Sequence, residues 1–172
     1  AEIEELRRQA EDKSAEKYSQ AAQRSQSIWE QCVEVQKHTY LEKKQVLSYG
    51  LRKDKHDNLV IPLKDKQGSI VGLQFIAPDG TKRFLTGSKK SGSFFLLGRE
   101  IFNTTDTLNY AEGYATAASI YADRSQPVVV AFDAYNLIKV AEVMYQYFPT
   151  HKHIFVADND DSNTGENEAK KA

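Results

Sequence analysis

The chain has 172 residues, of which 40% are hydrophobic and 27% charged, and its formal net charge is −1 at pH 7. No apolar run approaches the ~18 residues of a membrane span and no secretory signal pattern opens the chain, so we expect a cytoplasmic protein that does not contact a membrane. The single cysteine, Cys32, excludes an internal disulfide and a multi-thiolate zinc site.

Charge is distributed unevenly along the chain. Residues 1–36 carry five Lys or Arg against eight Asp or Glu, residues 37–99 carry thirteen against five, and residues 100–172 carry five against eleven. The near-neutral total therefore hides a basic middle segment that precedes an acidic one.

The first 36 residues predict one long helix, since they contain neither proline nor glycine and are rich in strong helix formers. Apolar residues are sparse in its first half, whereas the second half repeats them at three-to-four spacing from Tyr18 to Val33. We expect only the second half to dock firmly. Because the chain starts with Ala1 and a helix pattern runs into Ala172, we also expect it to be a piece of a longer protein.

Residues 37–105 predict a small, basic antiparallel β subdomain of about four strands. The runs "NLVIPL", "SIVGLQFI" and "KRFL" are separated by the turn sequences "KDKQG" and "APDG". Asp79-Gly80 is a dipeptide typical of tight hairpin turns. The run "SFFLLG" is expected to complete this antiparallel unit.

Residues 106–172 predict a different architecture. Strand-like runs "LNYAE", "PVVVAF" and "KHIFVAD" alternate with the helix-like runs "GYATAASIYADR" and "NLIKVAEVMYQYF", and a further helix is expected from about Gly165. This alternation predicts a Rossmann-like parallel sheet with its ligand site beyond the carboxyl ends of the strands. The fold class is α/β within that region and α+β for the whole chain.

Acidic residues follow all three predicted parallel strands: Glu112, Asp133, and the pair Asp158 and Asp160. Carboxylates gathered at one sheet edge repel one another unless a cation compensates, and oxygen ligands without His or Cys favour Mg²⁺ or Mn²⁺. Read alone, "DNDDSNTG" also suits a polar turn. Glu112 on the same edge favours the metal site, while Asp161 stays open between a water-mediated ligand and a turn residue.

Three segments resemble the motifs of the TOPRIM domain: "LNYAEGYATAASIY", "PVVVAFDAYNL" and "HIFVADNDDSNTGENEA". The resemblance implies that Glu112, Asp158 and Asp160 hold catalytic Mg²⁺. Asp133 departs from the family pattern and is assigned only a possible outer-ligand role, and Asn136 is expected to cap the following helix. The resemblance also implies that the domain is truncated, because its last strand and helix are missing.

The preceding region, from "IWEQC" to "SGSFFLLG", resembles DNA primases of plasmids and phages, namely the TraC-like and primase-helicase group. This implies Mg²⁺-dependent synthesis of short RNA primers from ribonucleoside triphosphates on single-stranded DNA, in a bacterial host and beside a fused or separate replicative helicase. The basic residues predicted to bind template and nucleotide are Lys43, Lys44, Arg52, Lys82, Arg83, Lys89 and Lys90.

Two alternatives remain open: a TOPRIM nuclease that uses the same acids, and a non-catalytic module that binds single-stranded DNA or a partner protein. Apart from His153, which opens the third motif ahead of its acids, no histidine lies inside the motifs to act as a general base, which favours the primase. Phe84, Phe94 and Phe95 could stack on bases, but their spacing favours core packing for most of them.

Overall fold

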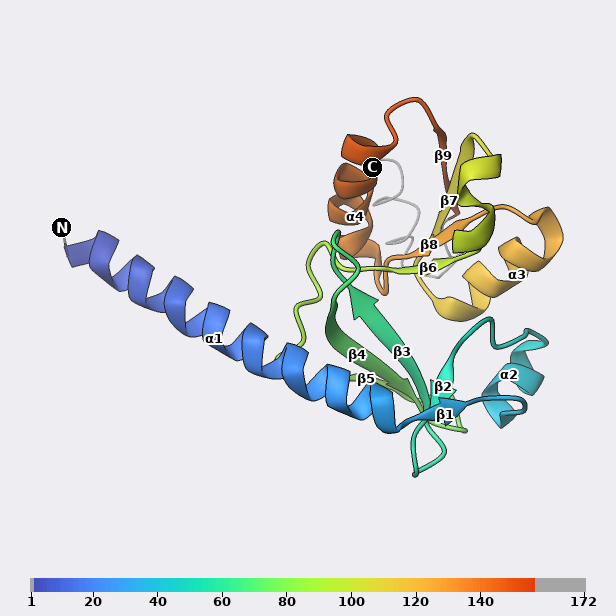
Figure 1. Cartoon of the computed structure of the whole chain (residues 1–172), viewed down its shortest axis with the longest axis horizontal. Coiled ribbons are helices and arrows are strands. Elements are labelled where there is room, and N and C mark those ends of the chain that lie inside the picture. Colours follow the sequence, from blue (N-terminus) through green and yellow to red (C-terminus); the bar gives the residue numbers. More distant parts are fainter. Residues whose placement is uncertain (1, 157–172) are drawn as a thin grey trace.

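The structure is a computed structural model, and it describes residues 2–156 (Figure 1). Two sheets form the body: a five-stranded sheet in the order β1-β2-β3-β4-β5 and a four-stranded sheet in the order β6-β8-β7-β9. The strands of the first sheet and its two helices are α1 (Glu2–Gln31), β1 (Val33–Glu34), α2 (Thr39–Lys44), β2 (Arg52–Lys53), β3 (Leu59–Lys64), β4 (Ile70–Ile76) and β5 (Lys82–Phe84). The second sheet follows with β6 (Phe95–Leu97), η1 (Arg99–Thr104), β7 (Thr107–Ala111), α3 (Tyr114–Arg124), β8 (Val128–Val130), α4 (Ala134–Tyr147) and β9 (Lys152–Val156).

Helix α1 confirms the predicted amino-terminal helix and its division into two halves. Its residues up to 20 are exposed, and Figure 1 shows this half extending away from the body. Ala21 and Ser25 are fully buried where the second half crosses β4. The helix ends at Gln31 rather than at residue 36, because residues 33–34 pair with β2 as a short strand.

The first sheet is antiparallel throughout, as predicted for its hairpins. Strands β3 and β4 pair from Leu59 opposite Ile76 onward, and Gly80 has a φ of +94° in the turn to β5. Alternate side chains of β3 face opposite ways: Leu59 belongs to the core shared with the second sheet, whereas Val60 packs near α1. The sheet is therefore covered on both faces.

The run "SFFLLG" does not complete this sheet, which corrects the prediction. Its strand β6 pairs antiparallel with β8, with Phe95 opposite Val130, and forms an edge of the second sheet. A single bridge from Phe94 to Lys64 is its connection to β3. The reason is packing, because the alternating apolar residues of β6 fill the core between the two sheets.

The predicted parallel sheet is confirmed for the described strands. Strand β7 lies at its centre and pairs in parallel with β8 and β9. Helix α3 packs with the core on one face through Ala117 and Ala118, and α4 packs on the other through Leu137 and Val140. The helix expected from about residue 165 lies outside the described residues.

No helix within residues 2–156 combines the length and the apolar character that a membrane crossing requires.

Candidate active site

Glu112 lies at the carboxyl end of the central strand. It follows β7 directly, and Gly113 takes the N-cap position of α3 with extended backbone angles (φ −115°, ψ 157°). The Oε1 atom of Glu112 is buried. A carboxylate at this position faces the amino end of a helix, whose backbone N–H groups favour negative charge.

The register of the sheet brings two strand ends to one level. Ala111 pairs with Val156 of β9 on one side and with Val130 of β8 on the other. Strands β7 and β9 therefore end at the same edge of the sheet. The predicted ligands Asp158, Asp160 and Asp161 lie outside the described residues, and within residues 2–156 no three His, Cys, Asp or Glu side chains form a metal-binding group.

Asp133 caps helix α4, which corrects the expectation that Asn136 would do so. Its Oδ1 accepts a hydrogen bond from the Asn136 backbone N–H at 2.8 Å, because the helix begins at Ala134 and Asp133 holds the N-cap position. Its Oδ2 pairs with Lys90 Nζ at 2.5 Å. Asp133 thus has structural partners of its own at the sheet edge.

Asn136 ties the basic loop before β6 to the end of β8. Its side chain is buried, its Oδ1 accepts from Gly92 N–H at 2.7 Å, and its Nδ2 donates to Ser93 O at 2.9 Å and Ala131 O at 2.8 Å. Sequence reasoning missed this role. An amide at the first position of the predicted helix run "NLIKVAEVMYQYF", shortly after a strand end, is the available signal.

Glu112 after β7 and Asp133 after β8 mark what we call the acidic edge of the second sheet, and Lys82 reaches it from the first sheet. A Cβ atom added to Gly113 would lie 3.6 Å from Lys82 Nζ, so the ammonium group lies beside the turn that carries Glu112. Arg83, the next residue of β5, places its guanidinium 4.5 Å from the centre of the Phe75 ring. Strand β5 therefore carries one predicted cation to the acids, and it holds the other against an aromatic side chain.

Helix α2 lies beside the hairpin that carries Lys82. The ring of Tyr40 lies 3.6 Å from the position that a Cβ atom of Gly80 would take. Hydrogen bonds from the Thr81 backbone and side chain lower the pKa of Asp79 below its usual value, and nearby Lys43 adds to this lowering. Lys43 and Lys44 are exposed in the last turn of this helix.

The remaining predicted cations differ in their surroundings. Arg52 donates to the Trp29 backbone carbonyl at 2.9 Å and lies 4.5 Å from the Trp29 ring centre, so its guanidinium joins α1 to β2. Lys89 is exposed, and Lys90 lies 5.1 Å from the ring centre of Phe84 as well as against Asp133. The structure brings Lys82 and Lys90 to the acidic edge, while Arg52 has a contact elsewhere.

The three phenylalanines show mainly packing roles. Phe95 is buried in the main core, and Phe84 packs edge-on against Phe132 with 6.1 Å between ring centres. Phe94 lines a groove that is separate from the acidic edge.

The chain resembles known proteins both in sequence and in structure. No family model matches the chain. Two sequences named DNA primase TraC from Escherichia coli are each 39% identical to it over 102 residues, or 59% of this chain. The primase fragment of the bacteriophage T7 primase-helicase protein superposes with a TM-score of 0.56 and 25% identity, covering 72% of this chain and 53% of that one.

The chain is thus similar to TraC primases over part of its length. It spans 10% and 7% of the lengths of the two TraC primases that it matches. A DnaG primase catalytic domain bound to single-stranded DNA shares the fold over 93% of this chain and 66% of its own, with a TM-score of 0.51 and 14% identity. The chain therefore shares its α/β fold with primase catalytic cores.

Proposed function

We propose that the chain is part of the catalytic core of a DNA primase, which synthesises short RNA primers on single-stranded DNA during plasmid or phage replication in the bacterial cytoplasm. The observation that carries this proposal is the position of Glu112 at the carboxyl end of β7, with Lys82 of the basic hairpin beside the same turn. The likeness to TraC supports the choice of primase among proteins that carry such acids.

The donor chemistry at the edge fits a divalent cation. Glu112 offers a buried carboxylate oxygen, a hard ligand of the kind that Mg²⁺ and Mn²⁺ prefer. In this proposal Glu112, Asp158 and Asp160 hold the metal, and Asp161 is a tentative further ligand. When bound, the cation would activate the attacking ribose hydroxyl and neutralise charge on the leaving pyrophosphate.

The basic residues have a complementary task. An acidic edge repels the backbone of a nucleic acid, and lysine or arginine side chains nearby offset that repulsion. We propose that Lys82, which lies beside the turn that carries Glu112, contacts a phosphate there, and that the exposed Lys43, Lys44 and Lys89 add positive charge for the same nucleic acid. We assign the template and the triphosphate to this surface, together with Arg83 and Lys90.

The names of the similar structures, a DnaG domain bound to single-stranded DNA and a fragment of a primase-helicase protein, support a nucleic-acid template and a helicase as partners here. One bacteriophage T7 structure contains primase domains bound to an RNA/DNA hybrid and dTTP, with a TM-score of 0.53 and 23% identity. We propose single-stranded DNA, ribonucleoside triphosphates and a fused or separate replicative helicase as partners. We further propose three parts, with residues 1–36 as a helix, 37–105 as the basic subdomain and 106–172 as the TOPRIM domain.

One assay separates the primase from its alternatives. The chain is incubated with single-stranded DNA, labelled ribonucleoside triphosphates and Mg²⁺, and the products are resolved on a sequencing gel. Short labelled oligoribonucleotides are expected. Shortened DNA would instead show a nuclease, and unchanged DNA with retained binding would show a non-catalytic module; either result overturns the proposal.

A further inference from the structure

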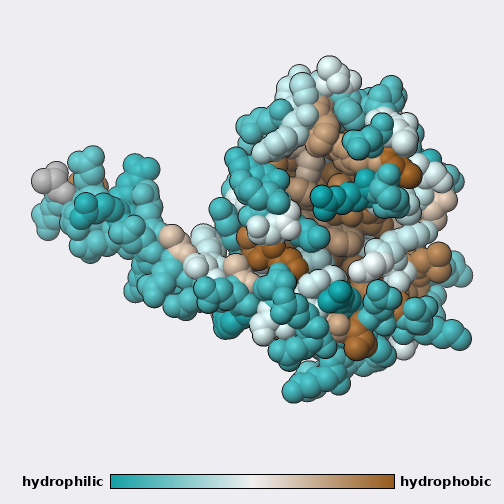
Figure 2. Space-filling view, in the orientation of Figure 1, coloured by the Kyte–Doolittle hydropathy of each residue, from teal (hydrophilic) through white to brown (hydrophobic). Residues whose placement is uncertain are grey.

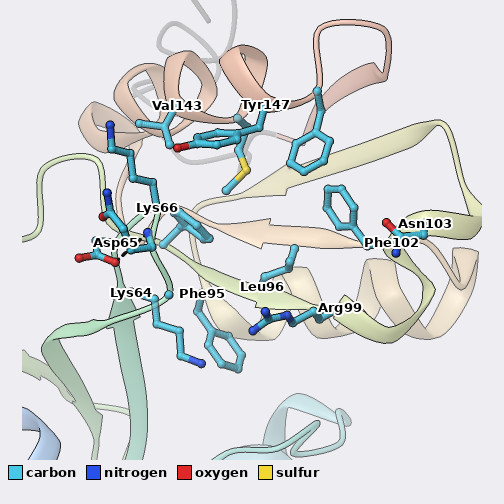
Figure 3. Close-up of a pocket in the computed structure, with 15 residues that line it drawn as sticks. Lys64, Asp65, Lys66, Phe95, Leu96, Arg99, Phe102, Asn103, Val143 and Tyr147 are labelled. Carbon is cyan, nitrogen blue, oxygen red and sulfur yellow. Dashed lines mark hydrogen bonds between the residues drawn. The ribbon is translucent and has the colours of Figure 1, made fainter.

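A groove lies apart from the acidic edge, along the outer side of β6. It has a volume of about 400 Å³, and its walls come from the β3–β4 turn, β6, η1 and α4 (Figure 3). Glu112, Asp133 and Lys82 do not line it. The groove therefore belongs to a different surface from the proposed catalytic site.

The floor of the groove is apolar. Leu96 and Phe94 of the β6 segment line it together with Met144 and Phe148 of the α4 region. These side chains are packed against the core on the α4 face of the sheet, and Leu96, Phe94 and Phe148 remain partly exposed. Such a floor suits aliphatic or aromatic side chains of a ligand.

The rim of the groove is cationic. Lys64, Lys66 and Arg99 line it, and Figure 3 shows Lys64 and Arg99 on either side of Phe95. Asp65 is the one acidic residue in the lining, and its Oδ1 already accepts from the backbone N–H groups of Gln67 and Ser69 at 3.0 and 2.9 Å. Burial, with a contribution from nearby Arg99, lowers the pKa of Lys64 below its ordinary value. An anionic ligand would relieve this excess of positive charge.

The floor is bordered by β6, the edge strand of its sheet, which is bridged to the end of β3 at Phe94. Lys64 and Phe94 exchange two backbone hydrogen bonds, of 2.9 and 3.0 Å, on the side of β6 that faces away from β8. Backbone groups alternate in direction along a strand, so the N–H and C=O of Leu96, two residues later, point to that same outer side. Because β6 is the edge of its sheet, an added strand can pair there.

We propose that this groove binds an extended acidic peptide segment of a partner protein. The peptide pairs with the Leu96 backbone, places apolar side chains on the floor between β6 and α4, and sets its carboxylates against Lys64, Lys66 and Arg99. Edge pairing of this kind supplies affinity through the main chain, while the floor and the rim select the side chains. Single-stranded nucleic acid could contact the cations and the aromatic rings, but its backbone cannot form the hydrogen bonds of an added β-strand.

The probe for this proposal is a fluorescein-labelled ten-residue peptide with a central Leu-Phe-Leu triplet flanked by aspartates, followed by fluorescence anisotropy with the whole 172-residue chain. Saturable binding that weakens with salt is expected. Two control peptides separate the contributions: one replaces the aspartates by asparagines, and the other methylates the central backbone nitrogens. Each is expected to bind at least about 10-fold more weakly.

The matching protein variant is Lys66→Glu with Arg99→Glu, both on exposed side chains. It is expected to lower affinity for the acidic peptide at least about 10-fold, whereas Lys13→Glu with Lys17→Glu on α1, which changes the net charge equally, leaves it unchanged. Equal losses in both variants, or no binding of the peptide, would overturn the proposal. It would also be overturned if the groove variant lost affinity for oligo-dT and not for the peptide. Primer synthesis is not a readout here, so failure of this proposal leaves the primase assignment untouched.

Discussion

Lys82 and Gly113 meet across the two sheets of the molecule, with Lys82 Nζ 3.6 Å from the position that a Cβ atom of residue 113 would take. Lys82 comes from the hairpin of the basic segment, and Gly113 follows the carboxylate that ends the central parallel strand. This contact joins the basic and the acidic segments of the sequence at one surface. It is the basis for expecting nucleic-acid phosphates at the acidic edge.

Replacing Lys82 by glutamine is expected to weaken binding of single-stranded DNA and to reduce its salt dependence. One phosphate contact fewer lowers the slope of log affinity against log salt by about 0.7. The measurement is anisotropy of labelled oligo-dT over a range of NaCl concentrations. Lys17→Gln, on the exposed half of α1, is the control and keeps the parent slope. An unchanged slope for the Lys82 variant would remove this lysine from the interface.

Substitutions of Asp133 distinguish a helix-capping role of this residue from a metal-binding role. Asp133→Ala removes the N-cap of α4 and is expected to cost about 1 kcal/mol of unfolding free energy. Asp133→Asn keeps a capping oxygen and loses only the partly exposed pair with Lys90, so its cost stays below about 1 kcal/mol. Urea unfolding checks both values. If Asp133→Asn kept its stability but lost primer synthesis at least about 10-fold, Asp133 would have a role beyond capping.

Gly72 tests the packing of β4 against the loop that leads to β6. A Cβ atom at this position would lie 2.5 Å from Ser88 Cβ and 2.6 Å from Ser88 Oγ, so Gly72→Ala forces a shift and is expected to destabilise the chain by about 1–3 kcal/mol. Gly113→Ala meets only an ordinary contact at 3.6 Å and is expected to cost less than about 1 kcal/mol. Equal melting temperatures for the two variants would contradict this account.

The pH dependence of stability has a local source in the turn before β3. Burial of the Asp54 carboxyl opposes its ionisation, but hydrogen bonds from the Asn58 side chain and from the Asn58 and His56 backbones together lower its pKa. A carboxyl whose folded-state pKa is depressed contributes stability above its unfolded pKa of about 3.9 and loses it as the pH falls through the folded value.

Asp54→Ala is therefore expected to cost about 1 kcal/mol or less at pH 7, because solvent screens this partly exposed carboxyl, and to cost less at pH 3. Urea unfolding of both proteins at the two pH values measures the difference. Asp123→Ala, at an exposed position of α3, is the control. Its cost in unfolding free energy should be the same at pH 7 and at pH 3. A difference that stays constant or widens at pH 3 would show that Asp54 does not stabilise the turn through its charge.

The parallel sheet could be predicted from the sequence because its signals are local. Short apolar runs became β7, β8 and β9, and the amphipathic helices α3 and α4 separate the three. Once the alternation of strand-like and helix-like runs is recognised, the position of Glu112 at a strand end follows from the βαβ rule alone. The second half of α1 was predictable for the same reason, since its apolar repeat is continuous.

The features that the sequence did not predict depend on contacts between distant residues. The alternating apolar residues of β6 suit either sheet, and the pairing of Phe95 with Val130 decides between them. Asp133 and Asn136 can both cap a helix, and the start of α4 at Ala134 assigns the cap to Asp133. The contact between Lys82 and Gly113 likewise arises only when the two sheets pack together.

The most direct test of the central claim is primer synthesis by Glu112→Gln, which keeps the size of the side chain and removes its charge. Loss of a metal-holding carboxylate worth several kcal/mol is expected to reduce primer synthesis at least about 100-fold, with the melting temperature retained. Asp123→Asn, an exposed acid on α3, is the matched control and should keep the parent rate. If Glu112→Gln makes primers at the parent rate under the same Mg²⁺ concentration, the carboxyl end of β7 is not the catalytic centre.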